Sequence, residues 1–117
     1  MKKERIPGLI DFFIDHIENI DTCENCGLDL SRTKSGKNVA HILPKSKFKS
    51  VATHDKNVLY LCTTFDRNDG HTGCHERYDS SWEKARTLPV FVLALSRFGE
   101  FRDQIKETSK ILFYFDE

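Results

Sequence analysis

Apolar residues near the beginning of the chain recur at the period of a helix. Four of them have the i, i+3, i+4, i+7 spacing of one helix face: Ile10, Phe13, Ile14 and Ile17. Pro7 suits the first turn of such a helix, where its missing N–H costs no hydrogen bond. The pattern predicts a helix over residues 7–20 with these four side chains buried, and it leaves His16 at the surface.

Two apolar runs in the middle of the chain predict a pair of strands. Residues 37–43 form the first run, which Pro44 ends because proline forces the chain into an extended exit. Residues 57–62 form the second run and combine β-branched and aromatic side chains. A basic loop joins the two runs, and the turn-rich segment 63–73 follows the second.

Helices are predicted after this pair of strands. Residues 74–83 contain no glycine or proline, and Tyr78 and Trp82 are four residues apart, as neighbours on a helix are. Residues 87–108 begin with an N-cap-like threonine and continue into an apolar stretch that we expect to pack against the N-terminal helix. Residues 110–117 are strand-like by composition, although a helix end or a partner surface would have the same composition.

Length and composition favour one globular domain in the cytoplasm. The 117 residues leave room for about one core, and 31% charged and 38% hydrophobic residues are ordinary proportions for a globular protein. No apolar run approaches the roughly 18 residues that span a bilayer, and acidic residues interrupt the segment that a secretory signal would need to keep apolar. We therefore expect no membrane partner.

The net charge of zero conceals an uneven distribution. Residues 31–54 contain six lysines and arginines and no acidic residue, which leaves a net charge of −6 on the rest of the chain. A basic segment of this kind attracts phosphate groups by Coulomb attraction and counterion release. A solvated, lysine-rich loop would have the same composition.

The cysteines favour a metal site over disulfides in a reducing compartment. They are Cys23, Cys26, Cys62 and Cys74. The first two form a C-x-x-C pair, and Gly27 after it permits the tight turn that lets two thiolates converge. All four together would form a closed tetrahedral zinc site, which is structural because no position is left for water. Two alternatives stay open, namely unliganded core cysteines and a site in which His71 replaces one cysteine.

Four motifs within residues 22–80 together resemble the HNH endonucleases that are built around a zinc ribbon. In chain order they are Cys23-x-x-Cys26, Ala40-His41-Ile42-Leu43-Pro44, Asn57-Val58-Leu59-Tyr60-Leu61-Cys62 and Cys74-His75-Glu76-Arg77-Tyr78-Asp79. The resemblance implies an α+β fold: a small ββα-metal core with a zinc ribbon over about residues 22–85, flanked by an N-terminal helix and C-terminal helices. Residues 1–117 would then form a single nuclease domain.

The resemblance also implies a role for each site residue. His41 is the general base that deprotonates the attacking water, a task that suits a histidine near neutral pH. Asn57 holds the ring of His41 in one orientation and tautomer. His75 binds the catalytic Mg²⁺, Mn²⁺ or Ni²⁺, and Asp79 shares its helix face and offers a carboxylate to the same ion. The four cysteines bind the structural Zn²⁺.

One position departs from the family pattern. The residue before the catalytic histidine is often an Asp or His that binds the metal, whereas Ala40 has no ligand atom. The expected ligands are therefore His75, Asp79, substrate oxygens and water, and His54 and Asp66 are the loop residues available as recruits.

We expect the protein to be a metal-dependent endonuclease that acts on double-stranded DNA. Lys45, Lys47 and Lys49 follow the base histidine directly and are the expected contacts to DNA phosphates. Two other functions stay open. One is a zinc-containing nucleic-acid-binding module without catalysis, which Ala40 favours. The other is an interaction or inhibitor protein that works through the apolar C-terminal segment.

Overall fold

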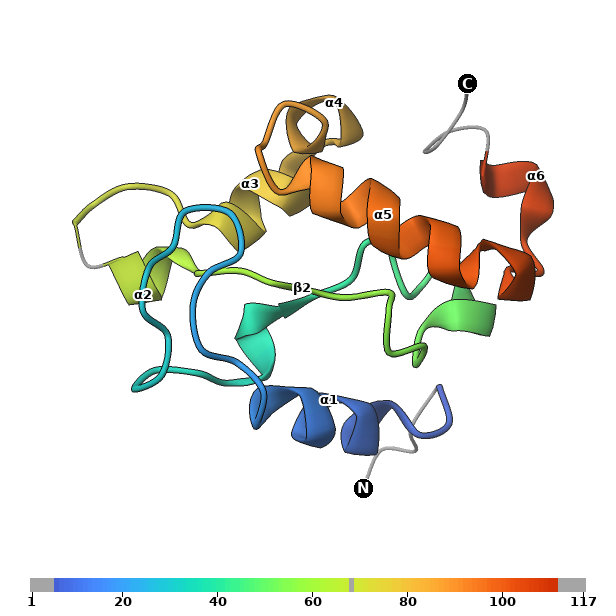
Figure 1. The fold of residues 1–117 in the computed structure, drawn as a ribbon, viewed down its shortest axis with the longest axis horizontal. Coiled ribbons are helices and arrows are strands. Elements are labelled where there is room, and N and C mark those ends of the chain that lie inside the picture. Colours follow the sequence, from blue (N-terminus) through green and yellow to red (C-terminus); the bar gives the residue numbers. More distant parts are fainter. Residues whose placement is uncertain (1–5, 68, 112–117) are drawn as a thin grey trace.

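The computed structural model describes residues 6–67 and 69–111 and has an α+β architecture (Figure 1). Its elements in chain order are α1 (Leu9–Ile17), η1 (Gly36–Asn38), β1 (Val39–Ala40), η2 (Lys49–Val51), β2 (Leu59–Tyr60), α2 (Thr64–Arg67), α3 (Cys74–Ser80), α4 (Trp82–Ala85), α5 (Phe91–Phe101), η3 (Arg102–Gln104) and α6 (Thr108–Ile111). Among the described residues, no helix has both the length and the apolar character needed to cross a lipid bilayer.

The two strands form an antiparallel sheet between the helices (Figure 1). The register pairs Val39 with Tyr60 and Ala40 with Leu59. Backbone pairing continues past the strands, because the Leu61 N–H donates to the Asn38 carbonyl oxygen at 2.9 Å. The predicted strand pair is therefore present, but β1 and β2 are shorter than the predicted strands 37–43 and 57–62.

Polar side chains shorten the first strand. The Ser35 hydroxyl accepts a hydrogen bond from the Lys37 N–H at 3.2 Å, and the Asn38 side chain accepts from the Ser35 N–H at 2.9 Å. These bonds satisfy backbone groups locally and favour the 3-10 turn η1 over a strand. After Ala40 the chain leaves the sheet and reaches Pro44 through irregular backbone.

The buried face of α1 differs from the predicted one. Phe12, His16 and Ile20 are buried, whereas Ile10 and Ile14 are 62% and 53% exposed. Positions 12, 16 and 20 also form a helical stripe, which a polar residue at its centre conceals in the sequence. The expectation that His16 lies at the surface is wrong.

Hydrogen bonds offset the free-energy cost of burying the polar side chain of His16. Its Nδ1 lies 2.7 Å from the Tyr60 hydroxyl oxygen and its Nε2 lies 3.2 Å from Oδ1 of Asp55, while its ring centroid is 4.5 Å from that of Phe12. A buried polar group that keeps its partners avoids most of the desolvation cost. His16 therefore packs α1 against β2.

The predicted helix over residues 74–83 is interrupted. α3 ends at Ser80, and Ser81 has an extended backbone with φ −166° and ψ 155°. The Ser81 hydroxyl accepts from the Lys84 N–H at 3.1 Å and thereby caps α4. The turn-rich segment 63–73 likewise contains the short helix α2, which the sequence does not predict.

Figure 1 shows α1 and α5 on opposite sides of the strands. The expected packing of the apolar stretch against the N-terminal helix is therefore wrong, because the sheet separates the two helices. Arg97 of α5 donates to the Val58 carbonyl oxygen at 2.7 Å, just before β2. The predicted helical segment 87–108 breaks into α5 and η3. Of the predicted strand-like segment 110–117, residues 110 and 111 belong to α6, and the remainder lies outside the described residues.

Candidate metal centre and active-site cleft

The four cysteine thiols converge on one point. Their sulfur atoms all lie within 4.8 Å of one another, and the Sγ atoms of Cys26 and Cys62 are 3.8 Å apart. Sulfurs bound tetrahedrally to zinc at about 2.3 Å stand about 3.8 Å from each other. The cysteines can therefore hold a metal ion such as zinc, and the predicted clustering of all four is confirmed.

Local backbone geometry brings the thiols together. The Gly27 N–H donates to the Cys23 carbonyl oxygen at 2.8 Å, and Gly27 adopts a φ of 79°, which suits glycine. On the other side, the Cys74 N–H lies 3.4 Å from the Cys62 sulfur, and the His75 N–H donates to the Cys62 carbonyl oxygen at 2.9 Å. These bonds hold the beginning of α3 against the end of the second strand segment.

Hydrogen bonds among the cysteines and their neighbours favour a thiolate at one of them. The Asn25 amide donates to Sγ of Cys74 at 3.3 Å, and the Arg67 guanidinium donates to Sγ of Cys26 at 3.6 Å. A hydrogen bond with the Cys74 thiol lowers the pKa of Cys23 to about 4, and the same bond raises the pKa of Cys74. A thiolate, which is the form that binds metal, is therefore present at neutral pH.

The two residues between the first cysteines also anchor α5. Both carboxylate oxygens of Glu24 accept from Arg97, at 2.8 and 2.6 Å, and one of them accepts from the Tyr60 N–H at 2.8 Å. The Asn25 side-chain oxygen accepts from the Val90 N–H at 3.0 Å, where α5 begins. The metal centre and the position of α5 therefore depend on the same turn.

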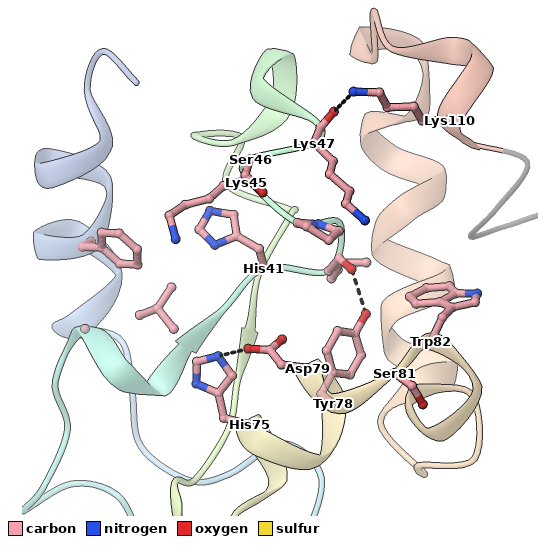
Figure 2. A pocket seen from close by; sticks show the side chains of 15 residues that line it. His41, Lys45, Ser46, Lys47, His75, Tyr78, Asp79, Ser81, Trp82 and Lys110 are labelled. Carbon is pink, nitrogen blue, oxygen red and sulfur yellow. Dashed lines mark hydrogen bonds and ion pairs between the residues drawn. The ribbon is translucent and has the colours of Figure 1, made fainter. Parts of the chain in front are cut away.

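A cleft of about 910 Å³ contains most of the predicted site residues other than the cysteines (Figure 2). His41, Lys45, Lys47, His75 and Asp79 line it. Figure 2 shows the side chains of His41, Lys45 and Lys47 on one side and those of His75 and Asp79 of α3 on the other. The apolar part of the lining comes from Phe13, Val39, Ile42, Pro44, Tyr78 and Trp82.

A backbone carbonyl orients the ring of His41. Its Nε2 lies 2.7 Å from the Ala52 carbonyl oxygen. Because a carbonyl oxygen only accepts hydrogen bonds, Nε2 carries the proton and Nδ1 keeps its lone pair. Burial lowers the pKa of His41 to about 4, in spite of the bond to Ala52, and the charge of Lys45 acts in the same direction as burial. His41 is therefore neutral at physiological pH, and its Nδ1 has no hydrogen-bond partner among the described residues.

His75 and Asp79 form a pair on one face of α3, as the spacing predicts. Nε2 of His75 lies 3.0 Å from Oδ2 of Asp79, and Nδ1 of His75 donates to the Lys37 carbonyl oxygen at 2.5 Å. Adjacent ligands at about 2.1 Å from an octahedral ion stand about 3.0 Å apart, and the pair has this spacing. Burial would lower the pKa of His75, but the hydrogen bond and charge of Asp79 outweigh it and raise this pKa.

Asn57 does not hold His41, and the expectation of a direct contact is wrong. Its side chain is fully buried, accepts from the Leu43 N–H at 2.8 Å and donates to the carbonyl oxygens of Leu43 and Val51 at 3.3 and 3.1 Å. These bonds tie the two ends of the loop after β1 together. Asn57 therefore shapes the segment that carries Ala52, the residue that does contact His41.

No family model, curated protein or solved structure matches this chain. The chemistry of the site residues and their positions in this fold therefore indicate their roles. Within the described residues, the four cysteines are the only group of three or more potential ligands that converge on one point. The His75 and Asp79 pair would need water or substrate oxygens to complete the coordination of an ion.

The other candidate ligands lie outside the cleft lining. The Asp66 carboxylate accepts from the Asn38 amide at 2.7 Å, which gives it a structural partner. Nδ1 of His54 accepts from the Lys56 N–H at 3.1 Å. His71 is exposed and stays outside the cysteine group, and Ala40 is fully buried. Neither of the two proposed recruits reaches the His75 and Asp79 pair.

The basic residues of the cleft are only partly those expected. Lys45 and Lys47 line it, whereas Lys49, in η2, does not. Lys110 of α6 lines it as well, and its Nζ donates to the Lys47 carbonyl oxygen at 3.4 Å. The local sequence gives no sign of Lys110, because this contact joins residues 63 positions apart. The role of Ala52 could not be predicted from the sequence either, because every residue type has a backbone carbonyl oxygen.

Proposed function

We propose that this chain is a metal-dependent endonuclease that hydrolyses phosphodiester bonds of double-stranded DNA. The observation that carries the proposal is the state of His41. Its Nε2 donates to Ala52 in a cleft lined by lysines, and the Nδ1 of this neutral imidazole has no hydrogen-bond partner in the part of the chain that the structure describes. A neutral histidine with one nitrogen fixed and the other free is the arrangement that general-base catalysis requires.

Each side chain of the cleft then has a defined task. Nδ1 of His41 takes a proton from water, the water oxygen bonds to phosphorus, and the bond from phosphorus to the 3′ oxygen breaks. The leaving oxygen takes up a proton from solvent, and the products carry a 5′-phosphate and a 3′-hydroxyl. Lys45 and Lys47 bind the negative phosphate and hold it near His41.

His75 and Asp79 would hold the divalent cation, Mg²⁺, Mn²⁺ or Ni²⁺. An imidazole nitrogen and a carboxylate oxygen 3.0 Å apart suit two adjacent positions of an octahedral ion. Such an ion, when bound, neutralises charge on the phosphate and on the leaving oxygen. The Lys37 carbonyl oxygen fixes the tautomer of His75 by accepting from its Nδ1, which leaves Nε2 for the cation.

The same reasoning supports a structural zinc and a ββα-metal fold of the HNH type. In the order β1, β2 and α3, His41 follows the first strand and His75 lies at the beginning of the helix, which supports the roles of base and metal ligand proposed for them. Cys74 precedes that histidine directly, which joins the four-cysteine site to the catalytic one. A closed set of four thiolates leaves no position for water, and a zinc ion there would stabilise the fold without taking part in hydrolysis.

A second candidate function is favoured by Ala40. This residue is fully buried and offers only a methyl group where a third protein ligand would complete the catalytic site. If two protein ligands bind the cation too weakly, the protein would bind nucleic acid through its basic cleft without cleaving it. The two candidates agree on the zinc and on the partner, and they differ in the need for His41.

Cleavage of supercoiled plasmid separates the two. The parent protein is incubated with Mg²⁺, Mn²⁺ or Ni²⁺ beside two variants, His41→Ala and His75→Ala, and a control, His54→Gln, whose histidine lies outside the cleft lining. We expect cleavage by the parent and the control, and a loss of about 100-fold to 10,000-fold in His41→Ala with unchanged DNA affinity. His75→Ala should recover in part at high Mn²⁺. DNA binding without cleavage under every metal would instead establish the second candidate.

A further inference from the structure

The cleft continues around α3 into two further hollows. One, of about 520 Å³, shares His75 and Asp79 with the cleft. It also shares Glu76 and Ser80 with the other, of about 490 Å³, on the far side of the helix. The cleft and the two hollows therefore follow one another around α3, with the His75 and Asp79 pair between the lysines of the cleft and the far hollow.

Two cations of the far hollow are available for a ligand. Among the described residues, the side chains of Arg77 and Lys84 form no ion pair, and both residues are exposed. The carboxylate in the lining, Glu76, is engaged by the Thr64 N–H at 2.9 Å. Arg67 also lines the hollow, but it already pairs with Asp69 at 3.0 Å. Glu76 keeps its negative charge, and with Arg67 paired to Asp69 the cations Arg77 and Lys84 leave the hollow with an excess of one positive charge.

The lining suits a phosphate and not a base. Of the described residues, it contains the hydroxyl residues Thr72 and Ser80, the imidazole of His71 and the two unpaired cations, and no phenylalanine, tyrosine or tryptophan. A stacked base needs an aromatic or apolar platform, whereas a phosphodiester needs cations and hydrogen-bond donors. A free inorganic phosphate would satisfy the same chemistry, but only a polyanionic strand would occupy this hollow and the cleft at the same time.

We propose that this hollow is a second phosphate-binding subsite, in which Arg77 and Lys84 bind the backbone of the strand that crosses α3. This inference rests on the proposed function and extends it. The strand would contact Lys45 and Lys47 on one side of the His75 and Asp79 pair, and the far hollow on the other. The bound DNA is then held on both sides of the bond that is cut.

The test measures DNA binding in the absence of added divalent cations, where no cleavage occurs. Fluorescence anisotropy gives the dissociation constant of a labelled duplex over a range of salt concentrations for three double variants. They are Arg77→Gln with Lys84→Gln, Lys45→Gln with Lys47→Gln, and the charge-matched control Arg32→Gln with Arg86→Gln. Neither control residue lines the cleft or the two hollows. Zinc content and a cooperative melt confirm that each variant is folded.

The subsite predicts that the slope of log affinity against log salt falls by about 1.8 in the Arg77 and Lys84 variant, because each lost phosphate contact removes about 0.9. The control should keep the parent slope. If only the Lys45 and Lys47 variant lowers the slope, the subsite is overturned and the proposed function stands. If the parent itself shows no salt-dependent binding, both fail.

A second measurement locates the contact on the DNA. Single phosphates on either side of the cleavage position are replaced by neutral methylphosphonates. At one position the replacement should weaken binding by the parent but have no further effect on the Arg77 and Lys84 variant. Equal weakening of both proteins at every position would overturn the subsite. The subsite would also be overturned if inorganic phosphate bound the hollow while the Arg77 and Lys84 variant kept the parent slope of log DNA affinity against log salt.

Discussion

His41 should remain neutral far below the pH at which an ordinary histidine is protonated. Burial lowers its pKa from the usual value of about 6.5 to about 4. At pH 6 about 1% of the ring would then be protonated, compared with about three quarters of an unperturbed histidine. NMR of the protein with isotope-labelled histidines tests this directly, and His41→Gln assigns the signal among the five histidines of the chain.

The same titration has a consequence for stability whose sign follows from the direction of the shift. Because the pKa is lower in the folded protein than in the unfolded chain, the stabilisation is complete above about pH 6.5 and is lost as the pH falls towards 4. The full loss is about 3 kcal/mol, from about 1.4 kcal/mol per pKa unit. Urea denaturation of the parent should show this loss, and His41→Gln should lack it.

The tautomer of His41 offers a sharper test than the midpoint of its titration. The ¹⁵N shifts should show a proton on Nε2 and a bare Nδ1 throughout the neutral range, because Nε2 faces the Ala52 carbonyl oxygen. Lys45→Gln should raise the pKa of His41, since it removes a positive charge that lowers it. A midpoint near 6.5, or a proton on Nδ1, would refute the assignment of His41 as a prepared base.

Three other outcomes are expected. The protein should contain one zinc per chain by elemental analysis. A strong chelator should unfold it, because a domain of this size gains much of its folding free energy from such a site. A chelated protein that melts at the parent temperature would contradict this. Asn57→Ala should lower the free energy of unfolding, measured by urea denaturation, by about 3 kcal/mol, because it removes three buried hydrogen bonds. The exposed control Asn19→Ala should change this free energy by less than about 0.5 kcal/mol. Lys49→Gln should leave the salt dependence of DNA binding nearly unchanged, since Lys49 does not line the cleft; a slope reduced by about 0.9 would place a phosphate beside it.

Short-range patterns in the sequence predict the parts of the site that one segment supplies. The i, i+4 spacing of His75 and Asp79 is enough to place them on one helix face, where they lie 3.0 Å apart. The C-x-x-C pair is likewise local, and its turn needs only Gly27. The meeting of this pair with Cys62 and Cys74 is predicted by chemistry, because four thiolates complete the tetrahedral coordination of one zinc ion.

Contacts between distant segments could not be predicted in this way. The partner of His41 is a backbone carbonyl of Ala52, and the side chain chosen for that task, Asn57, bonds to Leu43 and Val51 instead. The buried face of α1 is concealed because its central residue, His16, is polar and becomes buried only through its bonds to other segments. In each case the deciding partner is absent from the local pattern.

The bond from the Val90 N–H to the Asn25 side chain makes one amide a reporter of the cysteine turn. Asn25 also donates to the Cys74 sulfur, and its conformation therefore depends on the geometry of the thiolates. The Val90 amide lies at the beginning of α5, where the first turn of a helix has no carbonyl partner of its own. Among the described residues, Asn25 is the hydrogen-bond acceptor of this amide, and opening of the turn should therefore raise the exchange rate of Val90 before the interior of α5 begins to exchange.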